Sequence, residues 1–163
     1  MSTKTIVRVL AVVLITFLSA CKPRLLPNSS IPDTKQNRAI SEFMENYKTA
    51  ILNRSVSEIM AMVAPDYLET NGTADPSDDY HFSQLQKKLD ETYSHIKEIN
   101  LRYHIQSIVR KENTFNVYYY YNQHSLIAMP AEEKWMAVNE VNRLVLKMKG
   151  RSVSSGFEIV SGL

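Results

Sequence analysis

The spacing of apolar residues changes near residue 95, and this change constrains the fold more than any other feature. Before it, apolar residues recur every three or four positions over residues 34–53, 55–63 and 80–95. After it, they alternate with polar residues from Ile99 to Val109. The first spacing is typical of amphipathic helices and the second of a half-buried strand. The sequence therefore predicts three helices followed by a β-rich second half.

The helix boundaries carry their own signals. Asp33 or Thr34 is placed to cap the first helix, because a short oxygen-bearing side chain can accept a free amide hydrogen there. Ser55-Val56-Ser57-Glu58 fits a capping box that opens the second helix. Pro65 ends that helix, since the residue before a proline is driven away from helical angles.

The remaining strands follow at regular intervals. A short strand is expected over residues 66–70, and three longer ones over the ranges 115–127, 135–148 and 157–163. Polar or Pro- and Gly-containing turns separate the long strands, which favours an antiparallel meander. Helices segregated from an antiparallel sheet define the α+β class.

The N-terminal segment has the features of an export signal. Lys4 and Arg8 precede an apolar run from Val9 to Leu18, which is too short to span a bilayer. The segment ends in Leu18-Ser19-Ala20-Cys21, which resembles the lipobox of bacterial lipoproteins. The resemblance implies that residues 1–20 are removed and that Cys21, the only cysteine, becomes the lipidated first residue.

The sequence KPRLLPNSSIPD follows Cys21 and contains three prolines. This composition predicts that residues 21–33 form a lipidated, flexible tether and that residues 34–163 form the folded domain. The lipoprotein resemblance further implies attachment to the cell envelope. With Lys22 after the cysteine, it implies the periplasmic side of the outer membrane in a Gram-negative organism.

Charge and composition argue against nucleic acid as a partner. The whole chain has a formal net charge of +2 at neutral pH, and Lys4 and Arg8 in the expected signal account for it. A near-neutral domain lacks the basic stripe that follows a phosphate backbone. Only four glycines are present, so no glycine-rich phosphate loop is expected.

The order of elements resembles the nuclear transport factor 2-like superfamily, also called SnoaL-like or cystatin-like cone proteins. The segment Ala64-Pro65-Asp66-Tyr67 is similar to the stretch after its second helix, and Gly156–Leu163 is similar to its closing strand. The resemblance implies a curved sheet wrapped around the first helix, leaving a cone-shaped pocket. Members of the superfamily include enzymes, ligand binders and interaction modules.

No catalytic residue, metal site or cofactor is predicted. The resemblance places a ketosteroid-isomerase-like base near Thr70 or Asn71, where this chain has no carboxylate. We expect the neighbouring Glu69 to be a solvated carboxylate at the pocket rim. The histidines lack any compact ligand spacing; they are His81, His95, His104 and His124.

Two sets of residues remain as candidate sites. The first set would line the pocket and bind a small apolar or amphipathic ligand; it comprises Tyr47, Tyr103, Tyr121, Glu140 and Asn142. The alternative for Glu140 and Asn142 is a β-bulge that turns both toward solvent.

The second set comprises Tyr118, Tyr120 and Ile108, which we expect on the outer face of the sheet. Exposed tyrosines are enriched at interfaces, although they are also common in strands. The sequence thus favours a membrane-anchored, non-enzymatic module that forms a homodimer or binds an envelope protein. Ligand binding in the pocket is the alternative.

Overall fold

The structure, a computed structural model, describes residues 24–73 and 75–163. Within these residues it contains three α-helices, a four-stranded sheet and a small two-stranded sheet. The helices are α2 (Lys35–Leu52), α3 (Val56–Met62) and α4 (Phe82–Ser94). The strands are β1 (Leu68–Glu69), β2 (Tyr80–His81), β3 (Ile96–Lys111), β4 (Thr114–Ala128), β5 (Glu133–Met148) and β6 (Phe157–Ser161). Short 3-10 helices η1 (Pro76–Asp78) and η2 (Val153–Ser155) lie in the connections.

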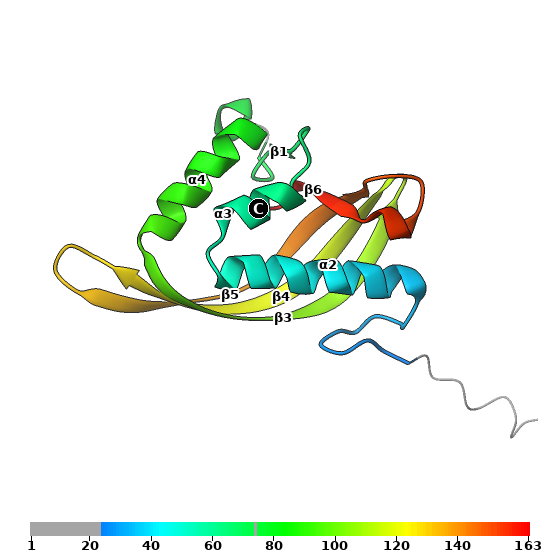
Figure 1. The fold of residues 1–163 in the computed structure, drawn as a ribbon, viewed down its shortest axis with the longest axis horizontal. Coiled ribbons are helices and arrows are strands. Elements are labelled where there is room, and N and C mark those ends of the chain that lie inside the picture. Colours follow the sequence, from blue (N-terminus) through cyan, green and yellow to red (C-terminus); the bar gives the residue numbers. More distant parts are fainter. Residues whose placement is uncertain (1–23, 74) are drawn as a thin grey trace, which may run out of the picture.

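The large sheet has the strand order β3-β4-β5-β6, and every neighbouring pair is antiparallel. This confirms the predicted meander and the α+β class. Figure 1 shows that the sheet is curved and that α2 runs along its inner face, with α3 and α4 on the same side. The pairing of β1 with β2 was not predicted, because two-residue strands leave no periodicity to detect.

The helices begin where their capping residues place them. The Thr34 hydroxyl accepts the Asn37 amide hydrogen at 3.1 Å, which identifies Thr34 as the N-cap of α2. Ser55 caps α3 by accepting the amide hydrogen of Glu58 at 3.3 Å. Each cap satisfies an amide that has no partner inside its helix.

The core lies between α2 and the inner face of the sheet. Ile40 and Met44 of α2 are buried against a continuous layer of inward-facing strand residues. That layer comprises Phe115, Val117, Leu144, Leu146, Phe157 and Ile159. The two elements thus enclose the apolar faces that the sequence periodicity predicts, and the buried set runs from Leu26 to Ile159.

A β-bulge in β3 corrects one prediction. The sequence predicts Ile108 on the outer face, but the structure packs it against the core. The register of β3 against β4 shifts between Ile105 and Ser107. One extra residue inverts the alternation, so Ile108 turns inward and Val109 becomes 50% exposed.

Residues 24–33 fold against the domain instead of forming the expected extended tether. This segment, here called the N-terminal hook, places Ser29 beside β3 in a parallel bridge to Ile105. The Ser30 amide donates to the Ile105 carbonyl at 2.8 Å, and the Ile105 amide donates to the Asn28 carbonyl at 3.1 Å. Leu26 and Ile31 are buried in the core. The prolines shape a compact turn here, and the folded domain includes residues that the sequence assigned to the tether.

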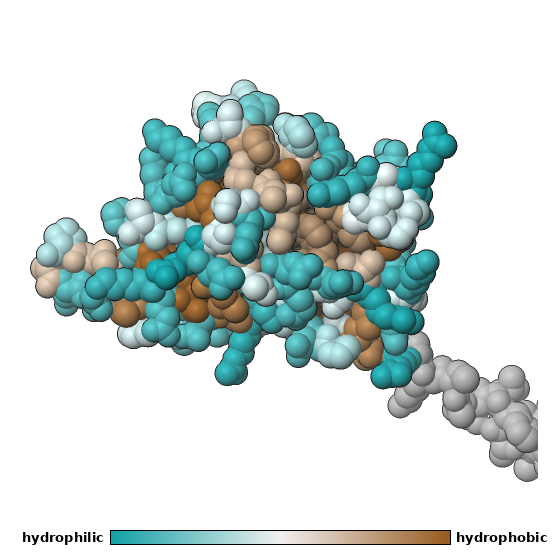
Figure 2. All heavy atoms as spheres, in the orientation of Figure 1, coloured by the Kyte–Doolittle hydropathy of each residue, from teal (hydrophilic) through white to brown (hydrophobic). Residues whose placement is uncertain are grey.

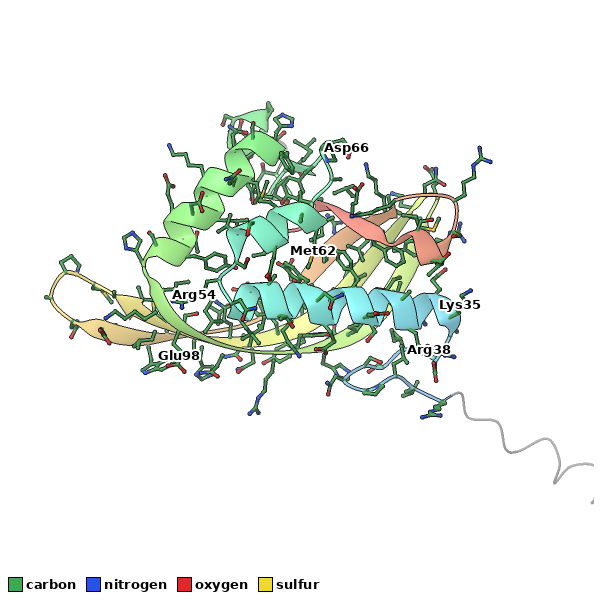
Figure 3. The ribbon with its side chains drawn as sticks, viewed as in Figure 1. Lys35, Arg38, Arg54, Met62, Asp66 and Glu98 are labelled. Carbon is green, nitrogen blue, oxygen red and sulfur yellow. The ribbon has the colours of Figure 1, made fainter. Side chains whose placement is uncertain are left out.

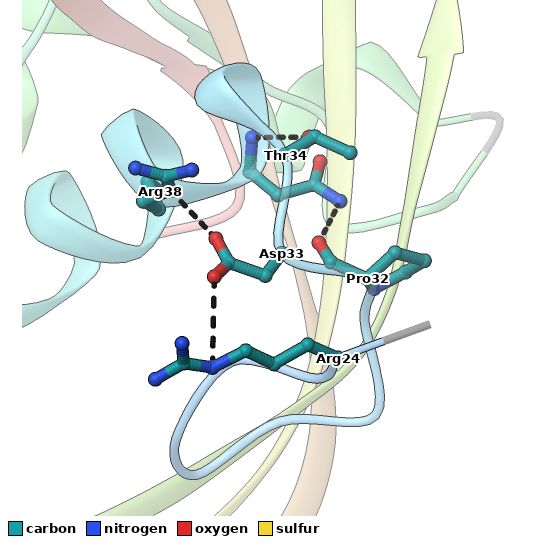
Figure 4. Close-up of polar contacts among 6 residues, drawn as sticks. Arg24, Pro32, Asp33, Thr34 and Arg38 are labelled. Atoms are coloured by element: carbon teal, nitrogen blue, oxygen red, sulfur yellow. Dashed lines mark hydrogen bonds and ion pairs between the residues drawn. The ribbon is translucent and has the colours of Figure 1, made fainter. Parts of the chain in front are cut away.

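Ion pairs join the hook to the first turn of α2 (Figure 4). Asp33 lies 2.6 Å from the Arg38 guanidinium and 3.9 Å from that of Arg24. Arg24 is 90% exposed, and exposed pairs of this kind contribute little stability. Burial of Leu26 and Ile31 and the backbone bonds to β3 therefore hold the hook in place.

The expected signal at residues 1–20 and the expected lipidated Cys21 lie outside the described residues. In the part of the chain that the structure covers, the helices are too short or too polar to cross a membrane.

Candidate functional site

A cavity of about 420 Å³ lies between α2, α4 and the inner face of the sheet. Its wall is mostly apolar and aromatic: Met44, Tyr47, Ile51, Tyr80, Leu85, Leu89, Tyr93, Ile96, Leu101, Tyr103, Tyr119, Tyr121 and Leu163. Polar atoms come from Lys48, Lys88, Thr92, Gln123, Asn142 and Gly162. Figure 2 shows hydrophobic residues gathered between the helices and the sheet.

Four of the five residues predicted for ligand binding lie on this wall: Tyr47, Tyr103, Tyr121 and Asn142. Glu140 does not line the cavity but accepts a 3.4 Å hydrogen bond from the Tyr121 hydroxyl beside it. The bulge considered for Glu140 and Asn142 is absent, because β4 and β5 pair without a register shift along Thr114–Ala128.

One side of the cavity is held by a polar cluster around Glu45. Its carboxylate accepts a hydrogen bond from the Tyr103 hydroxyl at 2.8 Å and pairs with Lys48. Burial acts to raise the pKa of Glu45, but the hydrogen bonds from Lys48 and Tyr103 outweigh it and leave that pKa below its usual value. Glu45 therefore stays ionised at neutral pH and neutralises Lys48.

Asn142 of β5 organises the neighbouring part of the wall. Its side-chain amide donates to the Tyr119 hydroxyl at 3.2 Å and to the Gly162 carbonyl at 3.3 Å. These bonds fix the Tyr119 ring against Tyr103 and Tyr121, whose centroids lie 6.4 and 6.1 Å away. The aromatic wall is thus preorganised by its own polar contacts.

Tyr47 differs from these tyrosines, because no described residue hydrogen-bonds its hydroxyl. Burial raises the pKa of Tyr47 well above its ordinary value, and the neighbouring Tyr119 and Tyr93 add to the rise. The hydroxyl therefore remains protonated and is available to donate a hydrogen bond into the cavity. Because Tyr47 borders the cavity, a ligand oxygen placed there can accept this hydrogen bond, and one such bond contributes about 1 kcal/mol.

Sequence reasoning missed the wall contributed by residues 80–93. Tyr80 and Tyr93 line the cavity, and the Lys88 ammonium lies 4.0 Å from the centre of the Tyr80 ring. The apolar stripe of α4 was visible in the sequence. Periodicity alone does not reveal that α4 stands away from the sheet and leaves part of that stripe uncovered.

Glu69 is not the solvated rim carboxylate that the sequence predicts. It is buried, and its carboxylate accepts hydrogen bonds from the Tyr67 and Ser161 hydroxyls and from the Asn71 and Gly162 amides. Its role is to fasten residues 161–162 to β1. Glu69 and Asn71 line a separate, more polar hollow, and Thr70 lines neither space.

The described wall of the main cavity contains no Asp, Glu or His. All four histidines are exposed, and His104 contacts the hook through Ser30 at 2.9 Å. Among residues 24–73 and 75–163, no three His, Cys, Asp or Glu side chains are grouped to hold a metal ion. The polar side-chain groups at the wall are the hydroxyls of tyrosine and Thr92, the amides of Gln123 and Asn142, and the ammonium groups of Lys48 and Lys88.

The outer face of the sheet carries the other predicted set in part. Tyr118 is half-buried and Tyr120 is 40% exposed, while Ile108 lies on the inner face as described above. Val141 pairs directly with Tyr120, and Trp135 lies further along the same face of β5. Val141 is 58% and Trp135 is 50% exposed.

Comparison with solved structures shows a nuclear transport factor 2-like fold. A nuclear transport factor 2-like superfamily protein from Salmonella enterica serovar Typhimurium matches with a TM-score of 0.62 and 12% identity, over 78% of this chain and 87% of that one. A ketosteroid isomerase-like protein from Erwinia carotovora matches with a TM-score of 0.61 and 12% identity, over 79% and 94%. A conserved protein from Planctomyces limnophilus matches at 0.62 and 9%, over 77% and 91%. No protein-family model and no curated protein matches the sequence.

Proposed function

We propose that the domain binds a small aromatic or amphipathic molecule in the main cavity. The observation that carries this proposal is a preorganised aromatic cavity of about 420 Å³ with the Tyr47 hydroxyl free to donate into it. Ligand pockets typically combine such an apolar wall with a few fixed polar groups and have volumes of roughly 300–1,000 Å³. Because the described wall has no Asp, Glu or His side chain, binding without catalysis accounts for the site better than acid–base chemistry of such side chains does.

A pair of probe molecules tests the role of Tyr47. We expect 2-naphthol to bind more tightly than naphthalene, because its oxygen can accept the free hydrogen bond. Tyr47→Phe should weaken 2-naphthol binding about fivefold, the value of one net hydrogen bond, and leave naphthalene binding unchanged. Both affinities can be measured by titrating the intrinsic fluorescence of the probe.

Tyr118→Phe is the matched control, since it removes a hydroxyl from the outer face of the sheet. It should change neither affinity. Failure of either probe to bind the native protein would contradict the proposed site. An equal loss for both probes in Tyr47→Phe would show that the substitution disturbs the cavity wall, and it would contradict a hydrogen bond from this hydroxyl to the ligand.

We further propose that this domain is carried by an exported lipoprotein with lipid on Cys21. The support is the sequence alone: a basic start, a short apolar run and Leu18-Ser19-Ala20-Cys21. Mass spectrometry of protein from the membrane fraction should find Cys21 as the acylated first residue. The Cys21→Ala variant should carry no lipid. A soluble, unlipidated product cleaved elsewhere would overturn this proposal.

A homodimer is a second candidate role, favoured by the exposed apolar residues Tyr120, Trp135 and Val141 on the outer face. Exposed tyrosine and tryptophan are enriched at protein interfaces. Sedimentation equilibrium of the domain should then show a concentration-dependent dimer. A monomer at every concentration would remove this candidate.

A further inference from the structure

Basic side chains are concentrated at one end of the domain. The N-terminal hook, the start of α2, the β3–β4 turn and the β5–β6 connection all lie toward that end (Figure 1), where α2 contacts η2 of the β5–β6 connection. Figure 3 places Lys35 and Arg38 at this end. The exposed basic residues that these segments contribute are Arg24, Lys35, Arg38, Arg110, Lys111, Lys149 and Arg151, here called the basic pole.

The register of the sheet brings two parts of this pole together. Lys111 pairs with Thr114, and Thr114 pairs with Lys147 two residues before Lys149. The ends of β3 and β5 therefore lie two strand spacings apart, which is about 10 Å. The ring T-contact between Phe43 and Phe157, at 6.2 Å, ties the first half of α2 to the same end of β6.

Few acidic residues oppose this charge. The same segments contribute Asp33, which pairs with Arg24 and Arg38, and Glu112 in the turn. Acidic residues outnumber basic ones in and around η1, α4 and the β4–β5 hairpin, where Lys87, Lys88, Lys97 and Lys134 are accompanied by Asp75, Asp78, Asp79, Asp90, Glu91, Glu132 and Glu133. A chain that is close to neutral without its first twenty residues thus has its charges separated along the molecule.

The basic pole is also where the chain enters the domain. The apolar run of the signal ends at Leu18, and Cys21 precedes Arg24 by three residues. Because the hook packs against β3, those three residues are all that separates the fold from the anchor. Three residues span at most about 10 Å. Charges act over a Debye length of about 8 Å at physiological salt, so anchoring would bring the pole within reach of lipid headgroups.

We propose that the basic pole docks on an anionic phospholipid surface and sets the orientation of the anchored domain. The hook makes the connection short, and the lysine and arginine side chains supply attraction to phosphate headgroups. The acidic end, with α4 and the β4–β5 hairpin, then faces away from the bilayer. This proposal relies on the N-terminal anchor proposed above, and its charge component can be measured without the anchor.

The test uses residues 22–163, which contain every buried core residue from Leu26 to Ile159. Co-sedimentation compares phosphatidylcholine vesicles with vesicles that also contain phosphatidylglycerol. We expect binding only to the anionic vesicles, and weaker binding as salt is raised. The triple variant Lys111→Gln, Lys149→Gln, Arg151→Gln should lose on the order of 100-fold in affinity, because each basic residue near such a surface contributes roughly fivefold.

The matched control is Lys87→Gln, Lys97→Gln, Lys134→Gln, which makes the same change in net charge away from the pole and removes only exposed ion pairs, which contribute little stability. It should reduce binding far less, and both variants should keep the thermal unfolding midpoint of the native chain. Equal losses in the two triple variants would show that only net charge matters and would overturn the proposal. Equal binding to both vesicle types, or binding to duplex DNA but not to anionic vesicles, would overturn it as well.

Discussion

Replacing Gly162 with alanine should lower the free energy of unfolding by roughly 3 kcal/mol, because the position admits no side chain. Its φ is +101°, and an added Cβ would lie 2.1 Å from the carbonyl oxygen of Arg143 and 3.0 Å from the Cα of Leu144. Both atoms belong to the backbone of β5, which cannot move aside without disturbing the sheet. The alternative is for residues 162 and 163 to detach.

Detachment has a comparable cost. The Gly162 amide donates to the buried carboxylate of Glu69, and the Leu163 carbonyl accepts the Tyr80 hydroxyl at 2.6 Å. Loss of a hydrogen bond to a buried charged group costs about 1.5–3 kcal/mol. Gly162 and Leu163 also line the main cavity, so 2-naphthol binding should weaken in the same variant.

Gly72→Ala is the control for the backbone angle alone. Gly72 also has a positive φ, +70°, but nothing lies within 4 Å of its added Cβ. It should cost only about 1 kcal/mol. Urea unfolding of both variants separates the two effects. Equal losses would mean that the close approach to Arg143 does not determine the stability at Gly162.

The sequence was sufficient for the main elements because their signals are local. The spacing of apolar residues and the caps at Thr34 and Ser55 predict α2 and α3 without knowledge of the fold. The turns between strands predict the meander in the same way. The alternation of β4 likewise placed Tyr121 on the inner face and Tyr120 on the outer one, on opposite sides of the sheet as observed.

Other features depend on tertiary contacts and could not be predicted from the sequence. The bulge at Ile105–Ser107 reverses which residues of β3 face outward after it, and no glycine in the sequence indicates its position. The prolines of the hook predict a tether, whereas its backbone bonds to the free edge of β3 and the burial of Leu26 and Ile31 explain why it folds. The sequence predicts a surface carboxylate at Glu69, because its hydrogen-bond donor Gly162 lies 93 residues later in the chain.

The cavity shows the same division. Tyr47, Tyr103 and Tyr121 follow from strand and helix phase, because each lies on an inward face. The positions of Tyr80, Lys88 and Tyr93 on the wall do not follow from the phase, because they depend on how far α4 and the residues before it lie from the sheet. The sequence therefore predicts the part of the wall that α2 and the sheet contribute, but not the part that residues 80–93 contribute.

Phe157→Ala should have the largest effect on stability, about 4 kcal/mol, because Phe157 joins three elements of the core. Its ring is 3% exposed and makes edge-on contacts with Phe115 of β4 at 5.7 Å and Phe43 of α2 at 6.2 Å. Truncation leaves a cavity that these rings cannot fill and removes both aromatic contacts. Urea or thermal unfolding measures the loss.

Phe157→Leu separates the two contributions. It restores most of the volume but not the edge-on geometry, so the loss should fall to about 1–2 kcal/mol. Phe82→Ala at the start of α4 is a matched truncation of a half-buried ring, and it should cost less than Phe157→Ala. A similar cost for both truncations would mean that the three-ring contact has no special weight.

Phe157 also provides a way to perturb the cavity from outside it. Phe43 precedes the cavity residues Met44 and Tyr47 on α2, and Phe157 itself is absent from the cavity wall. If the aromatic contact sets the position of α2, then Phe157→Leu should weaken 2-naphthol and naphthalene binding by the same factor. This equal loss contrasts with the loss for 2-naphthol alone that is expected from Tyr47→Phe. Unchanged binding in Phe157→Leu would show that the cavity wall is held by its own contacts, through Tyr103 with Glu45 and Tyr119 with Asn142, independently of the aromatic cluster.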